Sequence, residues 1–119
     1  MQAFRNLKVW EKAHALTLDV YRYSQAFPRE EICGLTSQMR RASVSIGANI
    51  AEGSCRGGDI DFARFLQMAA GSASELEYEL LLAHDLKLLS AADHERLSSQ
   101  AVEAKRMLAA FMKKLRADS

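Results

Sequence analysis

The stretch from residue 35 to residue 53, LTSQMRRASVSIGANIAEG, limits most strongly what this chain can fold into. At 3.6 residues per turn, its residues divide into a mainly apolar face, a polar stripe and a second face of small side chains. The apolar face holds Leu35, Met39, Ala42, Ile46, Ile50 and Gly53, and the small face holds Ser37, Val44, Ala48 and Ala51. A surface helix needs only one apolar face. We therefore expect this helix to be covered on most sides, in part by another subunit.

Four segments of the chain show the helical spacing of apolar residues. They cover residues 8–26, 35–53, 60–88 and the stretch from 91 to the C-terminal end. Three short connections between four helices are typical of an antiparallel up-down-up-down bundle. We find no alternating strand pattern, repeat or linker. The sequence therefore predicts an all-α four-helix bundle that forms a single domain over residues 1–119.

Several residues mark where these helices begin and end. Pro28 ends the first segment, because the residue before a proline is disfavoured in the α conformation. Asp59, after two glycines, and Ser90 are the expected N-caps of the third and fourth helices. In the first helix, Trp10 and Tyr21 are the expected aromatic anchors of the core.

Composition excludes several classes of protein. With 49% hydrophobic and 26% charged residues, the chain is neither disordered nor disulfide-rich. No apolar run reaches the roughly 18 residues of a membrane span. Cys33 and Cys55 lack the spacing of a metal site, so they are expected to be reduced thiols. These features predict a cytoplasmic protein that does not contact membranes.

The chain offers little for catalysis or metal binding. Di-iron bundles use two Glu-x-x-His pairs, and here only Glu11 and His14 make such a pair. His84 and His94 have no glutamate three residues earlier. No phosphate-binding loop or nucleophile–base pattern is present either. We therefore predict no catalytic residue, no metal and no cofactor. The alternative is a bundle, or an enzyme, that uses its interior to bind a metal or a small ligand.

The polar stripe of residues 35–53 suggests contacts with the third helix. If the two helices pack antiparallel, Arg40, Arg41 and Asn49 face Glu75 and Glu77. A partly buried charge pair would fix the register, because either charge alone would be costly to bury. The alternative is that the two arginines contact a ligand or nucleic acid. Pairing or a subunit interface is the interpretation that we favour.

Three strings of the sequence resemble one protein family. They are LKVWEKAHALTLDVY, FPREEICGLTSQMRRASVSIGANIAEG and FARFLQMAAGSASELEYEL. Over residues 4–115 the chain resembles the intervening-sequence proteins of 23S ribosomal RNA genes. The resemblance implies an up-down-up-down bundle, a homopentamer with a central channel, and no established activity. A related branch, the accessory proteins of diversity-generating retroelements, binds nucleic acid through a strongly basic surface, whereas this chain has a net charge of +1.

Charge is nevertheless unevenly distributed along the expected bundle. One end of the bundle holds the start of the first helix, the connection between the second and third helices, and the C-terminus. The net charge of this end is +4, and that of the other end is −3. In a ring, the basic end would repeat on one rim and could bind RNA or DNA weakly. The alternative is that the terminal cations only complement the helix dipole. The candidate nucleic-acid-binding residues are Arg5, Lys8, Lys12, Arg56, Lys113, Lys114 and Arg116.

Overall fold

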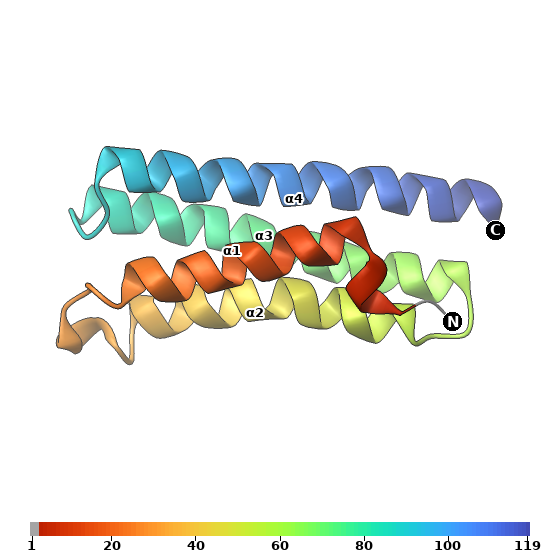
Figure 1. Ribbon diagram of the computed structural model, residues 1–119, viewed down its shortest axis with the longest axis horizontal. Coiled ribbons are helices and arrows are strands. Elements are labelled where there is room, and N and C mark those ends of the chain that lie inside the picture. The colour runs from red at the N-terminus through yellow and green to blue at the C-terminus, as the bar shows by residue number, and fades with distance from the viewer. Residues whose placement is uncertain (1–2) are drawn as a thin grey trace.

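The computed structural model describes residues 3–119, and their regular structure is helical throughout. The elements are η1 (Phe4–Asn6), α1 (Lys8–Ser24), η2 (Arg29–Glu31), α2 (Leu35–Ser54), α3 (Asp59–Asp85) and α4 (Ala91–Asp118). The four α-helices run alternately up and down (Figure 1), and each packs against its neighbour in sequence. α1 also packs on α4, which closes the bundle. The predicted antiparallel up-down-up-down four-helix bundle is confirmed.

The core consists of the apolar stripes that the helical spacing predicts. Ile46 and Ile50 of α2, Leu66 and Leu80 of α3, and Leu108 of α4 are completely buried. Alanines fill the positions between these large side chains, so the helices can approach closely. The described residues therefore share a single packed interior between the four helices.

α2 and α3 approach each other closely next to the connection between them. A Cβ atom added to the buried Gly53 would lie 2.7 Å from the Cβ of Phe65 and 2.8 Å from Cδ1 of Phe62. Neither distance is compatible with normal van der Waals contact. Glycine is thus required where the apolar face of α2 meets the two phenylalanines of α3.

The helix ends agree only partly with the sequence-based expectations. The Ser90 side chain accepts a hydrogen bond from the backbone N–H of Asp93 at 3.1 Å, which confirms this N-cap. The prediction for Asp59 was wrong: Gly58, in extended conformation, is the N-cap, and Asp59 is the first residue of α3. There its carboxylate still suits the positive end of the helix dipole. α1 ends at Ser24, two residues earlier than expected.

The two aromatic residues of α1 differ in how deeply they are buried. Trp10 is half-buried, and its ring stacks on His14 with the centroids 4.8 Å apart. Tyr21 is 40% exposed, so its assignment as a core anchor was wrong. Its ring instead lies beneath the guanidinium of Arg40, 4.6 Å from the ring centroid. The tyrosine contributes to the α1–α2 surface and not to the interior.

Candidate functional site

The start of α1, the α2–α3 connection and the end of α4 lie at one end of the bundle (Figure 1). Lys8 of α1 and Lys114 of α4 line the same surface groove, of about 400 Å3. The other residues of its lining are Leu7, Val9, Met107, Ala110 and Phe111. The structure therefore brings together two of the candidate nucleic-acid-binding lysines, over a mainly apolar floor. We call this feature the α1–α4 groove.

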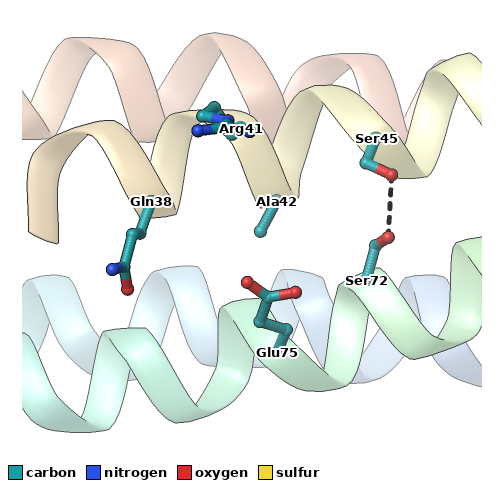
Figure 2. Close-up of a pocket in the computed structure, with 6 residues that line it drawn as sticks. All are labelled: Gln38, Arg41, Ala42, Ser45, Ser72 and Glu75. Carbon is teal, nitrogen blue, oxygen red and sulfur yellow. Dashed lines mark hydrogen bonds between the residues drawn. The ribbon is translucent and has the colours of Figure 1, made fainter.

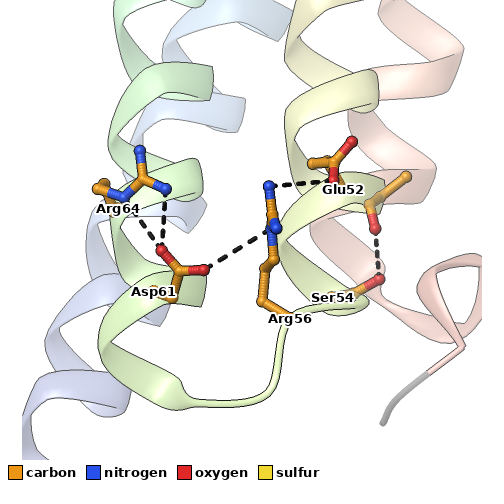
Figure 3. A network of polar contacts seen from close by, with 6 residues as sticks. Glu52, Ser54, Arg56, Asp61 and Arg64 are labelled. Atoms are coloured by element: carbon orange, nitrogen blue, oxygen red, sulfur yellow. Dashed lines mark hydrogen bonds and ion pairs between the residues drawn. The ribbon is translucent and has the colours of Figure 1, made fainter.

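Two of the predicted cations are already paired with acidic residues. The Arg56 guanidinium lies 3.3 Å from the Glu52 carboxylate and 3.7 Å from that of Asp61 (Figure 3). Lys12 lies 3.2 Å from Glu103 across the α1–α4 seam. These exposed pairs contribute little to stability. The neighbouring carboxylates do, however, partly cancel the positive charge that Arg56 and Lys12 present to an anionic partner.

The remaining candidate cations are exposed and have no carboxylate within 4.0 Å in the part of the chain that the structure describes. They are Arg5, Lys8, Lys113, Lys114 and Arg116. Arg116 donates a hydrogen bond of 3.4 Å to the Gln67 side chain, which is uncharged. Among the candidate residues, the unpaired positive charge therefore comes from the first residues of the bundle and from the last turns of α4.

A second groove, which is polar, runs between α2 and α3 (Figure 2). It has a volume of about 470 Å3 and is lined by Gln38, Arg41, Ala42, Ser45, Ser72 and Glu75. The Ser72 hydroxyl donates a hydrogen bond of 2.8 Å to the Ser45 hydroxyl across the seam. Arg41 and Glu75 thus share this groove as predicted, but among residues 3–119 no ion pair within 4.0 Å joins them.

The other predicted contacts of the polar stripe were wrong. Arg40 turns toward α1, where it donates hydrogen bonds to the Ser24 hydroxyl at 2.9 Å and to the Tyr21 carbonyl at 3.5 Å. Successive helix residues differ by about 100° in direction, so Arg40 and Arg41 face different neighbours.

Glu77 and Asn49 also have partners other than those expected. Glu77 accepts a hydrogen bond from Lys105 of α4 at 2.7 Å. Asn49 remains within its own helix, donating to the backbone carbonyl of Ser45 at 2.9 Å and to its hydroxyl at 3.1 Å. Of the five residues proposed to set the register, only Arg41 and Glu75 line the α2–α3 groove, and no ion pair within 4.0 Å joins them among the described residues.

Glu79, the most deeply buried carboxyl group of the described chain, was not predicted from the sequence. Only 3% of Glu79 is exposed, and its Oε1 atom has no hydrogen-bond partner within residues 3–119. Burial, followed by a hydrogen bond with Glu75 and repulsion from its charge, raises the pKa of Glu79 from 4.5 to about 7. A possible sequence signal was the four-residue spacing of Glu75 and Glu79, with Glu79 placed between apolar positions.

The small-residue face of α2 forms the floor of a third, apolar groove, between α1 and α2. Val44, Ala48 and Ala51 line it, together with Trp10, His14, Thr17 and Gly47, and its volume is about 320 Å3. Val44 is 46% exposed. Ser37, the fourth residue of the predicted interface, is half-buried and does not line the groove. Three of the four predicted interface residues thus share one apolar surface hollow.

Few groups suited to metal binding or catalysis lie together. Within residues 3–119, no cluster of three or more His, Cys, Asp or Glu side chains could hold a metal ion. Cys33 and Cys55 are free and exposed. The rings of His84 and His94 stack on each other at 4.9 Å, where α3 ends and α4 begins. Over the same residues, no helix combines the length and hydropathy that crossing a membrane would require.

The fold and its surface grooves define an antiparallel four-helix-bundle protein. The family model of the 23S rRNA-intervening sequence protein matches residues 5–110, so the chain belongs to this family. This confirms the resemblance that we inferred from the sequence.

The same fold is seen in a crystal structure of a protein of unknown function from the S23 ribosomal protein family of Bacteroides thetaiotaomicron. It aligns with a TM-score of 0.81 at 24% identity, over 88% of this chain and 98% of that chain. A search of curated proteins found no match.

Proposed function

We propose that this protein is a non-enzymatic, homo-oligomeric scaffold or binding protein whose basic end binds RNA or DNA weakly and without sequence preference. The observation that carries the proposal is the group of exposed cations without acidic partners at one end of the bundle, with Lys8 and Lys114 on a common groove. Contacts from lysine and arginine to phosphate release counterions and need no base recognition.

Self-association is supported by the apolar groove between α1 and α2. Small side chains at Ala48 and Ala51 allow another helix to approach closely, and the neighbouring Val44 and Trp10 offer apolar surface. A rotationally symmetric ring would repeat the basic end on one rim and so multiply its local field. The number of five subunits comes from the family resemblance.

The nucleic-acid part of the proposal is tested by titrating RNA and DNA at several salt concentrations. We expect binding near ~50 mM salt that weakens steeply as salt increases. Exchange of Lys113, Lys114 and Arg116 for glutamate should abolish it. The control exchanges Arg29, Lys87 and Arg96, at the other end of the bundle, for glutamate, which changes the net charge equally. If both triple variants lose affinity to the same extent, the effect is one of net charge and not of the basic end.

The assembly is tested by light scattering after size exclusion. Five chains of 13.3 kDa give a mass of roughly 66 kDa, whereas a monomer mass would reject self-association. Ala48→Arg should dissociate the oligomer, because an unpaired charge in an interface costs several kcal/mol. Ala109→Arg, on the exposed surface of α4, is the control. Metal analysis of the purified protein tests the alternative, because stoichiometric iron or manganese would favour a metal-binding bundle.

A further inference from the structure

The α1–α4 groove differs from the rest of the basic end because its floor is apolar. Leu7 and Val9 are buried beneath it, and Met107 and Phe111 are half-buried along the α4 side. The Phe111 ring packs edge-to-face on Phe62, with centroids 5.2 Å apart and an angle of 72°. This contact anchors the Phe111 ring to the core, so the aromatic part of the groove floor has a fixed position.

Positive charge borders this apolar floor on both sides. Lys8 stands on α1 and Lys114 on α4, both are exposed, and neither has a carboxylate within 4.0 Å among the described residues. Lys113 directly precedes Lys114 on α4, and Arg5 lies in η1, just before α1. A molecule that matches this surface would combine apolar planar groups with several negative charges.

We propose that the α1–α4 groove receives unpaired bases, so that the nucleic acid this protein prefers is single-stranded. This inference rests on the proposed nucleic-acid binding. In a duplex the bases are stacked and paired, and only phosphates would reach the lysines. A single strand can turn its bases onto Met107 and Phe111 while its phosphates contact Lys8 and Lys114, as in proteins that combine basic grooves with apolar or aromatic platforms.

Charge complementarity favours a polyanion over other occupants of the groove. An anionic amphiphile has one charged head, whereas cations border this groove on both walls, Lys8 on α1 and Lys114 on α4. The thioether of Met107 can adapt to bases of different shape. Binding would therefore tolerate sequence variation, in keeping with the absence of base-specific contacts in the proposed function.

The first test compares three labelled oligonucleotides on the full-length wild-type protein by fluorescence anisotropy. They are a single strand, a duplex with the same number of phosphates, and a single strand of equal length made of abasic sites. We expect the normal single strand to bind at least about fivefold more tightly than the other two, because each stacked base contributes a factor of roughly 5 to 150. Equal affinity for all three would overturn the inference and leave the proposed function standing. No binding of any of them would overturn both.

The second test changes the groove. Ala110→Gln places a flexible polar side chain, which offers no stacking surface, over the apolar floor at an exposed position that lines the groove, and Ala109→Gln adds it at the neighbouring exposed position outside the lining. We expect Ala110→Gln to lose the preference for single strands with duplex binding unchanged, and Ala109→Gln to behave like wild type. A long-chain carboxylate, or an acidic peptide of equal charge, that displaced the single strand equally well would assign the groove to that occupant and overturn the inference.

Discussion

Glu75 and Glu79 lie one turn apart on α3, and the carboxyl group of Glu79 is almost completely buried whereas Glu75 is exposed beside the polar groove. Burial and the neighbouring Glu75 raise the pKa of Glu79 to about 7. Below pH 4.5 this carboxyl is protonated in both the folded and the unfolded chain. Between pH 4.5 and about 7 the folded chain retains the proton that the unfolded chain loses. The contribution of Glu79 to stability therefore decreases across this window as the pH rises.

Glu79→Gln should remove this pH dependence, because glutamine is neutral at every pH. We expect the variant to be more stable than wild type at pH 8, by about 1–3 kcal/mol, and to match it at pH 4. Urea unfolding at pH 4, 6 and 8 and a fixed protein concentration measures the difference. Glu95→Gln, at an exposed position of α4, is the control and should be neutral. A constant difference between Glu79→Gln and wild type at all three pH values would contradict the assignment.

Two glycines, one in α2 and one in α3, differ in the space around them, so their exchange for alanine should change the stability of the protein in opposite directions. Gly53→Ala should destabilise the protein by about 1–3 kcal/mol, because the new Cβ would collide with Phe62 and Phe65. Gly71→Ala, in the middle of α3 with open space around it, should stabilise the protein by about 0.5–1 kcal/mol through helix propensity. Thermal unfolding followed by circular dichroism compares the two variants. If Gly53→Ala were neutral, the helices would be less closely packed here than the structure indicates.

At the basic end, exchanging unpaired lysines should reduce the salt dependence of nucleic-acid affinity, whereas exchanging a lysine that is already paired with a carboxylate should not. Exchanging Lys8 and Lys114 for glutamine should lower the slope of log affinity against log salt by up to about 0.7 per lysine for a single strand. Exchanging Lys12 and Glu103 together for glutamine removes an existing ion pair and leaves the net charge unchanged. That variant should retain the wild-type slope. A reduced slope for this charge-neutral variant would mean that Lys12 contacts phosphate despite its pairing.

The sequence was sufficient to predict the number, order and core faces of the helices. Leu97 and Leu108 of α4 recur at helical spacing and are fully buried, and Ser90 caps their helix as its position suggested. Both signals are local, since spacing and capping depend on residues within a few turns of one another.

Contacts between helices were harder to predict, because they depend on how each helix is rotated about its axis. Arg40 and Arg41 are adjacent in sequence, yet one lies against α1 and the other lines the α2–α3 groove. Glu77 pairs with α4, while the unexpected Glu79 is the acidic residue that is buried. Grouping polar residues into one stripe placed them within the same broad sector of a helix. It could not assign each of them to one of two neighbouring helices.

The four helices differ in length, and this bears on how tightly the basic end can hold a ligand. α4 has 28 residues and α1 has 17, and the last turns of α4 extend past the start of α1 (Figure 1). Lys113, Lys114 and Arg116 belong to the last two turns of α4, where Leu115 is the last buried side chain. Amide protons of residues 112–118 should therefore exchange with solvent much faster than those of residues 97–108. If nucleic acid slows that exchange, part of the binding free energy is spent on ordering the end of α4, which limits affinity however favourable the charges are.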